Sequence, residues 1–393
     1  MLIPLVLAIV AQGPGDSVSL GAALTRARSL RGQMTVAASR VAEARAALRS
    51  AGAITNPTVT FTHSGAVPQE HFLFDQPLDF LLRRGPERSA ARSRITSAQA
   101  DSSLTVAELM RDVRTAFYRA LAAAGEERLV TAQAGQADSV ARIAAARLEA
   151  GDISLLEQEQ AAQEAARARQ TLSAAREAAR VAEAALGRAI AWDGAEPPSA
   201  AGSLDAGLAD EPPALPPADS LPAVRTAVAE SVATAALARS ASVSRIPLPS
   251  IQGGAEWNDA TQPGTLAVLG FALPLPLWQS YGGPAAEAAA RARRAAALVS
   301  ETRLESARAL REARVRLVES SGRARFARDS LLPQAALLRG RAVRAYQAGE
   351  TGILPVLDAL RSEREVVLAA VQDQLAYQEA LADWYALLGR VDQ

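Results

Sequence analysis

Apolar and polar residues recur with two different periods along this chain. Over 86–190, Ala and Leu return at helical spacing among Arg, Glu and Gln, which are residues that favour helix. Ala150-Gly151-Asp152 divides this stretch, because glycine readily adopts the left-handed conformation that ends a helix. We therefore predict a hairpin of two antiparallel helices, the first of them on the order of 95 Å long.

The period changes to two before this hairpin. Residues 58–64 alternate, so that Val59 and Phe61 lie on one face and three threonines lie on the other. Such alternation predicts a strand with one apolar and one polar face. A returning strand is expected over 71–80, and a helix is expected over 19–51 before the two strands.

The same order of elements is predicted a second time. A proline-rich linker without a core pattern occupies 193–220. After it the sequence predicts a helix, strands over 250–257 and 265–278, and a second helical hairpin over 284–388. This order resembles that of the first half in every element.

Short matching segments support an internal repeat with an offset near 198 residues. The matches are Gly85-Pro86 with Gly283-Pro284, 148–152 with 346–350, 74–78 with 271–275, and 185–188 with 387–390. We therefore predict a first structural repeat over 16–192 and a second over 221–393, separated by the linker.

Four short strands leave two open edges and are too few to close a barrel, which takes about eight. Three copies would supply twelve strands, an even number that outer-membrane barrels use. Trp257 and Trp278 lie near strand ends, where aromatic side chains gather at membrane interfaces. The expected fold is mainly α with a small β part: long helical hairpins plus four strands per protomer in a trimeric twelve-stranded transmembrane β-barrel. The alternative is a soluble sheet that packs on the helices.

Composition narrows the function classes. Apolar residues make up 49% of the chain but aromatic residues only 4%, which suits close packing of alanine-rich helices better than a thick globular core. Lys and Arg together number 42, as do Asp and Glu, so net charge gives no indication of a nucleic-acid partner. The absence of cysteine excludes disulfides, thiolate metal sites and a cysteine nucleophile.

The N-terminal residues 1–11 form an apolar run that resembles the core of a secretory signal peptide, with cleavage after Ala11. The basic residues that usually begin such a signal are missing. The run is too short to span a bilayer. The alternative is an apolar N-terminus that is not removed.

The sequence contains no recognisable catalytic motif, so we expect no enzymatic activity and no cofactor. His63 and His71 are the only histidines and have no evident third ligand, so we expect no metal site. Asp75, Asp79 and Glu256 fit equally well as carboxylates that line a lumen or as solvated carboxylates at its rim. The alternating charges over 361–365 are typical of a solvated helix face.

The order, spacing and duplication of these features resemble the TolC-like outer-membrane efflux proteins. The resemblance extends over nearly the whole chain after the signal segment. It rests on Asn56-Pro57 before the first strand, Gly85-Pro86 after the second, 271–277 before Gly282-Gly283, 331–335, and the two hairpin turns. The segment 331–335 is most similar to the metal- and cation-efflux branch of the family.

The resemblance implies a homotrimer with its barrel in outer-membrane lipid and a long helical tunnel in the periplasm. The protein would be the passive channel of a tripartite efflux or secretion system, working with a periplasmic adaptor protein and an inner-membrane pump, without nucleic acid. The alternative from another class is a soluble or periplasmic coiled-coil scaffold without a pore.

The resemblance also implies roles for residues at the hairpin turns. In members of the family, a tyrosine bonded to an acidic residue holds the periplasmic entrance shut. By position these residues correspond to Tyr346 and Glu157, although the usual acid is Asp. The family also often carries two rings of aspartate on the last helix. The position of one ring is occupied here by Asp358, whereas Pro355 occupies the position of the other. Thr351 occupies the position of a nearby arginine. The turns that would contact the adaptor are Ala150, Gly151 and Asp152 in the first hairpin, and Ala348, Gly349 and Glu350 in the second.

Overall fold

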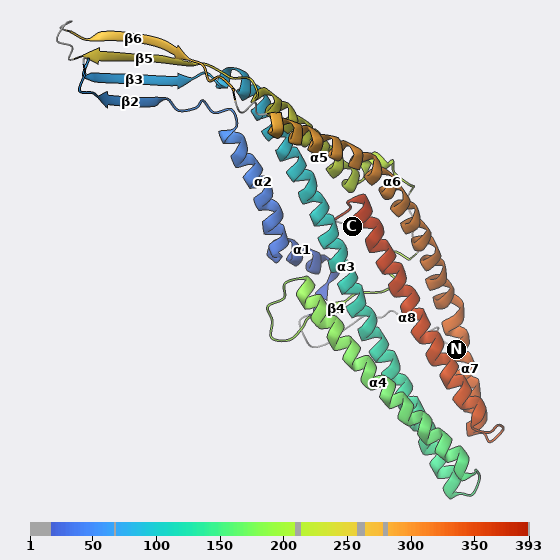
Figure 1. Cartoon of the computed structure of the whole chain (residues 1–393). Helices are drawn as coiled ribbons and strands as arrows, with labels where there is room; N and C mark the ends of the chain where they lie inside the picture. The colour runs from blue at the N-terminus through green and yellow to red at the C-terminus, as the bar shows by residue number, and fades with distance from the viewer. Residues whose placement is uncertain (1–16, 67, 209–213, 258–263, 278–281, 392–393) are drawn as a thin grey trace. The chain divides into compact units, whose positions relative to one another are not determined.

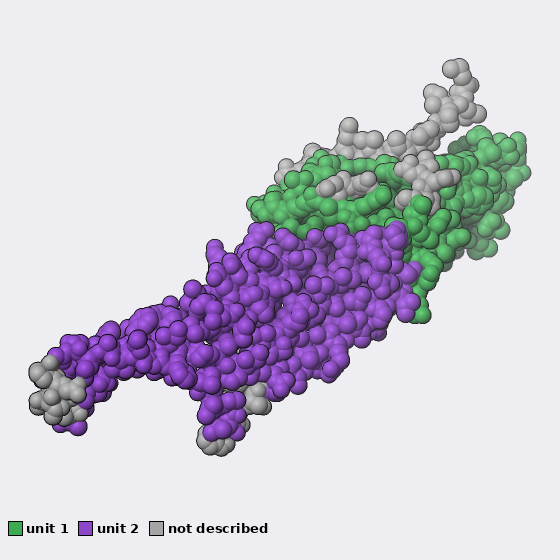
Figure 2. All heavy atoms as spheres, turned by 90° about the horizontal axis from the view of Figure 1, so that it is seen from above, with its two compact units in different colours: residues 1–34, 106–216, 308–393 green, residues 35–105, 217–307 purple. Residues whose placement is uncertain are grey.

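The computed structural model describes residues 17–66, 68–208, 214–257, 264–277 and 282–391 (Figure 1). The expected signal segment 1–11 and Trp278 lie outside the described residues. The chain forms two compact units, coloured in Figure 2. Unit 1 comprises 1–34, 106–216 and 308–393, and unit 2 comprises 35–105 and 217–307. Each unit thus contains segments from both expected repeats.

Helices dominate the structure, and the strands are short. In chain order the elements are β1 (Ser17–Ser19), α1 (Leu20–Leu30), α2 (Gly32–Ser50), β2 (Thr58–His63), β3 (Glu70–Pro77), α3 (Phe80–Glu149), α4 (Leu155–Ala189), β4 (Ser199–Ala201), a 3₁₀ turn (Ala218–Ser220), α5 (Pro222–Val243), β5 (Ser250–Trp257), β6 (Leu266–Ala272), α6 (Gly282–Phe326), a π-helical segment (Ala327–Leu331), α7 (Leu332–Gln347) and α8 (Leu354–Leu388). Among the described residues, the structure contains no helix long and apolar enough to cross a membrane.

The long helix α3 begins earlier than the sequence pattern indicates. Pro86 was expected at its first turn, but the helix starts at Phe80 and contains Pro86. The amide of Leu81 donates to the carbonyl of Leu78, and the amide of Arg83 donates to that of Asp79. These bonds form a first turn ahead of the proline, where the missing proline N–H removes one helical hydrogen bond without ending the helix.

Two other expected helices are interrupted. The helix expected over 19–51 breaks at Arg31, whose backbone is extended and whose Nη1 donates to the carbonyl of Arg188 at 2.9 Å. In the second hairpin, the π-helical segment separates α6 from α7 just before Pro333. Proline has no N–H to donate to the carbonyl four residues earlier and its ring crowds that carbonyl, which favours a local change of hydrogen-bonding pattern in the turn before it.

The linker 193–220 contains packed structure, contrary to the sequence expectation. Its strand β4 pairs in parallel with β1, and its side chains Leu204 and Leu208 are fully buried. Gln378 of α8 donates to the backbone carbonyls of Leu204 and Ala206 at 2.7 and 2.8 Å. Buried carbonyl groups need such partners, so α8 supplies what a sheet or helix would otherwise supply.

The ends of four helices share one hydrogen-bonding pattern. After α3, the amide of Asp152 donates to the carbonyl of Arg147, and Gly151 is left-handed with φ of 78°. Gly349 after α7 and Gly389 after α8 have φ values of 75° and 68°. This is the Schellman arrangement, in which a left-handed residue lets amides reach back to the last helical carbonyls.

The fourth of these helix ends is that of α4, and it shows that the match of 185–188 with 387–390 is out of register. Gly187 does not correspond to Gly389, because Gly187 lies inside α4. An added Cβ there would lie 3.3 Å from the ring of Pro198, so close packing favours glycine. The residue that ends α4 with positive φ is Ala191, at 51°. It lies 198 residues before Gly389, the offset shared by the two hairpin turns.

Replacing Ala191 with glycine is expected to stabilise the protein modestly. Alanine in the left-handed region costs about 1 kcal/mol, part of which is offset by the greater freedom of glycine in the unfolded chain, leaving roughly 0.5 kcal/mol. The reverse change at Gly389, to alanine, should destabilise by roughly 0.5 kcal/mol, because the same two effects act with opposite sign. Urea unfolding of the detergent-solubilised protein, followed by circular dichroism, measures both. Shifts of the midpoint in the same direction would contradict the assignment of Ala191.

Unit 2 contains an antiparallel four-stranded sheet in the order β2-β3-β5-β6. β5 has the bounds that the sequence predicts. β3 and β6 end earlier than expected, at Pro77 and Ala272, and prolines follow β6 at 274 and 276. Because proline cannot donate to a strand ladder, it is confined to strand ends and edges.

The sheet has two chemically different faces. The register pairs Phe61 with Phe72 and Phe72 with Ala255, which places these residues on one face. Seven large apolar residues on that face are exposed, and Trp257 on the same face is half-buried. The seven are Val59, Phe61, Phe72, Phe74, Ile251, Leu269 and Phe271. The opposite face carries Thr58, Thr60, Thr62, His71, Asp75, Ser250, Gln252 and Glu256. The expected segregation of apolar residues from threonines in 58–64 is therefore present in β2.

Candidate functional site at the hairpin turns and the sheet

Both helical hairpins, α3–α4 and α7–α8, have their turns in unit 1, and a small apolar cluster joins them near those turns. Its buried members are Val140, Ala144, Ala161, Tyr346, Ile353, Val356, Leu357 and Leu360. α4 contributes only alanine to this set, whereas α8 contributes branched side chains. Contact between α4 and α8 therefore buries little apolar area on the α4 side.

The turns themselves are exposed, as the adaptor-contact expectation requires. In each turn the left-handed glycine is flanked by two exposed residues, and all six predicted turn residues, Ala150, Gly151, Asp152, Ala348, Gly349 and Glu350, are exposed. The backbone bond from Glu350 to the carbonyl of Ala345 repeats the bond from Asp152 to Arg147. The two turns thus present similar backbone geometry.

Tyr346 is 1% exposed, and its partner within the chain is Arg147. The guanidinium of Arg147 lies 4.9 Å from the ring centroid and donates from Nη1 to the Tyr346 carbonyl at 3.2 Å. Burial raises the pKa of the Tyr346 hydroxyl, and the positive charge of Arg147 opposes that shift.

Glu157 has a different partner. Its Oε2 accepts from the backbone amide of Ser154 at 3.0 Å, while its own amide donates to the Ser154 hydroxyl at 3.3 Å, which forms a capping box at the start of α4. The described residues show no hydrogen bond between Tyr346 and Glu157. The negative charge of Glu157 nevertheless contributes to the raised pKa of Tyr346.

Asp358 lies on the exposed side of α8. Its neighbours Leu357 and Ala359 are buried, whereas Asp358 is exposed. Pro355 and Thr351, the positions of the missing ring aspartate and arginine, are exposed as well. Within one protomer, Asp358 therefore faces away from the apolar cluster.

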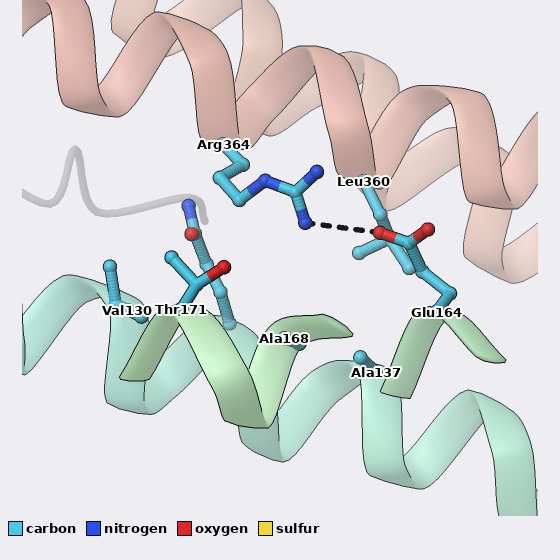
Figure 3. A pocket seen from close by; sticks show the side chains of 8 residues that line it. Val130, Ala137, Glu164, Ala168, Thr171, Leu360 and Arg364 are labelled. Carbon is cyan, nitrogen blue, oxygen red and sulfur yellow. Dashed lines mark hydrogen bonds and ion pairs between the residues drawn. The ribbon is translucent and has the colours of Figure 1, made fainter. Parts of the chain in front are cut away.

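The charged segment 361–365 is only partly the solvated face that the sequence predicts, because Ser362 and Glu365 are exposed whereas Glu363 is buried. Glu164 of α4 has only 3% of its side chain exposed (Figure 3). Its Oε2 accepts from Arg361 Nε at 2.9 Å and its Oε1 accepts from Arg364 Nη1 at 3.0 Å. Both arginines come from α8, so this ion pair joins the two hairpins.

A second buried carboxylate lies within 361–365 itself, and it pairs with an arginine of its own hairpin. Glu363 of α8 lies 2.9 Å from Nε of Arg339 in α7, with 11% of its side chain exposed. Burial raises the pKa of the Glu363 carboxyl, and Arg339 opposes the shift. Burial of Glu363 was missed because alternating charges such as those of 361–365 usually mark a solvated face.

The polar side of the sheet in unit 2 carries hydrogen-bonded carboxylates. Asp75 Oδ2 accepts from Ser250 Oγ and Gln252 Nε2, each at 2.7 Å. Glu256 Oε1 lies 3.2 Å from Nδ1 of His71. Both Asp75 and Glu256 thus lie on the polar sheet face.

The remaining predicted residues near the sheet have local partners. Asp79 accepts from the hydroxyl of Thr55 at 2.7 Å, just before α3. His63 Nδ1 lies 2.8 Å from Glu70 at the end of the first strand pair. Trp257 ends β5, with its ring centroid 6.1 Å from that of Phe61. In the described part of the chain, no group of three or more His, Asp or Glu side chains is placed to hold a metal ion.

Comparisons with known proteins agree with this architecture. Residues 23–191 match the family model described as outer membrane efflux protein. The cobalt-zinc-cadmium resistance protein CzcC of Cupriavidus metallidurans is 27% identical over 321 residues, which cover 81% of this chain and 74% of CzcC.

Solved structures share the fold at low sequence identity. CusC is 16% identical with a TM-score of 0.78, over 97% of this chain and 95% of its own. The outer membrane protein VceC of Vibrio cholerae is 17% identical with a TM-score of 0.74, over 94% and 96%. The open state of the MtrE outer membrane channel of Neisseria gonorrhoeae is 17% identical with a TM-score of 0.71, over 98% and 100%. Residues 23–191 thus match the outer membrane efflux protein family, and with the likeness to CzcC the findings identify an efflux channel of the outer membrane.

Proposed function

We propose that the protein acts as a homotrimer in which three four-stranded sheets join into one twelve-stranded transmembrane barrel. The observation that carries this proposal is the exposed apolar face of the sheet, on which Leu269 and Phe271 are 87% and 78% exposed. Large apolar residues on one face, with polar residues on the opposite face of β2, β3 and β5, are the pattern of a sheet between lipid and an aqueous lumen, although β6 itself carries no polar residue. The sheet ends in β2 and β6, whose outer edges would pair with the neighbouring copies.

In this arrangement the apolar face contacts outer-membrane lipid and the polar face lines the lumen. Asp75 and Glu256 would then each appear three times around the exit, where they favour passage of cations over anions. Trp257 and Phe61, which lie together at one end of the sheet, would belong to the aromatic belt at the membrane interface. Trp278 is proposed for the same belt.

The helical hairpins would form the periplasmic entrance, and their exposed turns would contact a periplasmic adaptor that connects the channel to an inner-membrane pump. Tyr346, Glu157 and Asp358 are proposed as the residues that control this entrance. Three exposed copies of Asp358 around a narrow pore would repel one another and attract cations. Transport through the channel would be passive, and adaptor binding would shift the population toward an open entrance.

We propose divalent metal cations as the cargo class. The support is the likeness to CzcC, described as a cobalt-zinc-cadmium resistance protein, together with the carboxylates expected along the pore. A solvated cation needs a negatively charged path and no permanent binding site, since tight binding would slow release.

Conductance measurements test the cation preference. Replacing Asp358 with alanine is expected to lower the cation-to-anion permeability ratio of the trimer in planar bilayers, on the order of tenfold at low salt, because the Asp358 carboxylates concentrate counter-ions. The effect should shrink at 1 M salt, where the Debye length is about 3 Å.

Asp152→Ala is the matched control, since Asp152 is an exposed aspartate at the other hairpin turn and should leave selectivity unchanged. The mass of detergent-solubilised protein from purified outer membranes provides the assembly test. A trimer in this fraction supports the shared barrel, whereas a monomer would contradict it.

A further inference from the structure

Glu164 lies at the junction of the two hairpins of unit 1. Its two carboxylate oxygens accept from Arg361 and Arg364, at 2.9 and 3.0 Å, and Figure 3 shows the pair with Arg364. The two arginines have 43% and 24% of their side chains exposed. We call these three residues the Glu164 cluster. The carboxylate is thus enclosed, whereas both arginines already contact solvent.

A buried ion pair differs from an apolar contact in how it responds to separation. Removing charges from water costs several kcal/mol per ion, and their attraction in the interior offsets much of that cost, so the pair adds little net stability. When two surfaces part, water forms hydrogen bonds with each charged group and replaces its lost partner. Apolar groups that become exposed form no comparable favourable interaction with water. A hairpin contact that combines the Glu164 cluster with an apolar cluster, to whose buried members α4 adds only Ala161, can therefore separate at lower cost than one packed from large apolar residues on both sides.

The structure also provides space for water at this point. A cavity of about 20 Å³ adjoins the cluster and is lined by Val130, Gln133, Ala137, Glu164, Ala168, Thr171, Leu360 and Arg364 (Figure 3). Its walls come from α3, α4 and α8, where α8 meets both helices of the other hairpin. A cavity of this size accommodates about one water molecule when polar groups line it. Gln133, whose buried Oε1 accepts no hydrogen bond from the described residues, offers such a group.

We propose that the Glu164 cluster is a polar latch that holds the α7–α8 hairpin against the α3–α4 hairpin and sets how often their turns separate. This inference rests on the proposed role of the turns as the channel entrance. Glu164, Arg361 and Arg364 act as positioning residues, because they control which arrangement of the hairpins is populated. The latch lies within helices α4 and α8, away from the hairpin turns, and it involves neither Tyr346 nor Glu157.

The chain contains a matched control for this latch. Glu363 is also a buried carboxylate bound to an arginine, but its partner Arg339 belongs to the same α7–α8 hairpin. Glu164→Gln and Glu363→Gln therefore make the same chemical change, and only the former removes a bond between hairpins. If buried charge merely stabilised the fold, the two variants would behave alike.

Because the chain has no cysteine, single introduced thiols report separation of the hairpins. Ala161→Cys places a thiol in the apolar cluster shared by both hairpins, where Ala161 is 1% exposed. Ala134→Cys places a thiol at a 3% exposed site whose buried cluster contains only α3 and α4 residues. The rates at which a maleimide modifies these thiols are measured on the full-length trimer in detergent.

We expect Glu164→Gln to speed modification of the Ala161→Cys thiol on the order of tenfold or more, while modification of the Ala134→Cys thiol stays unchanged. Arg364→Gln should act in the same direction and serves as the second variant if Glu164→Gln does not fold. Glu363→Gln should leave both rates near those of the parent proteins.

Two results would overturn the latch. One is equal acceleration at both thiols, which indicates general loosening of the fold. The other is no acceleration at Ala161→Cys in either latch variant. Trimer mass and conductance of the unmodified protein test the proposed function separately, so a channel that conducts without a latch is distinguishable from a protein that forms no channel.

Discussion

Gly254→Ala is expected to prevent the four-stranded sheet from forming, whereas Gly253→Ala is expected to be tolerated. A Cβ on Gly254 would lie 2.3 Å from the backbone carbonyl oxygen of Phe72 in the neighbouring strand β3. A Cβ on Gly253 would approach nothing closer than a Leu269 methyl group, at 3.8 Å. The first contact involves backbone, which cannot rotate away as a side chain can.

The cost at Gly254 is large because β3 and β5 are the central pair of the sheet. Forcing these strands apart weakens the ladder that joins residues of the first half of the chain to residues of the second. We expect a loss of about 3 kcal/mol or more in each protomer, at the upper end of what overpacking costs. A trimer would carry the change three times.

The amount of folded protein in purified outer membranes measures this effect. We expect Gly254→Ala to reduce the yield at least tenfold relative to Gly253→Ala, which should match the unmodified protein. Equal yields of the two variants would show that β3 and β5 pair with a different register or spacing.

Local signals explain why so much of the secondary structure is predictable from sequence. The alternation over 58–64 appears as β2, and the expected strand 250–257 appears as β5. Gly151 and Gly349 end their helices where expected. A helix end of this kind needs a left-handed residue, which depends only on the local backbone and which glycine adopts readily. The mainly helical fold with a small sheet, inferred from these signals, is confirmed by the solved structures that share it.

Features that depend on distant partners were missed. The turn that begins α3 is held by a bond from the amide of Leu78 to the carbonyl of Pro249, in the second half of the chain. The linker 193–220 is ordered by side chains of α8, about 170 residues away in sequence. Contacts of this kind produce no hydrophobic periodicity in the start of α3 or in the linker, so neither could be predicted from the local sequence.

The Glu164 cluster shows the same difficulty at the candidate site. Arg361 and Glu164 are 197 residues apart in sequence, and each resembles the charged residues on a solvated helix. One local signal was available: Glu164 lies in a helical stripe that otherwise contains the buried alanines Ala161, Ala165 and Ala168. A charged residue within an apolar stripe is rarely buried without a partner, so it indicates an opposite charge on a neighbouring helix.

Leu269→Arg is expected to abolish insertion into the outer membrane, whereas Val268→Arg is expected to be tolerated. Leu269 is the middle residue of β6 and is 87% exposed on the apolar face of the sheet. In the proposed barrel it would face lipid, where an arginine near the bilayer midplane costs about 2–4 kcal/mol in each of three copies. Val268 lies on the opposite face, where Gln252 and Glu256 offer hydrogen-bond acceptors.

The two substitutions introduce the same charge at adjacent positions of one strand, so any difference between them arises from the face of the sheet. Recovery of trimer from outer membranes is the measurement, with urea titration of the recovered protein as the second readout. Loss of trimer for Leu269→Arg alone supports a lipid-facing apolar surface. If both variants insert equally well, the apolar face is not in lipid, and the sheet would instead have to be covered by protein, as in the alternative soluble sheet.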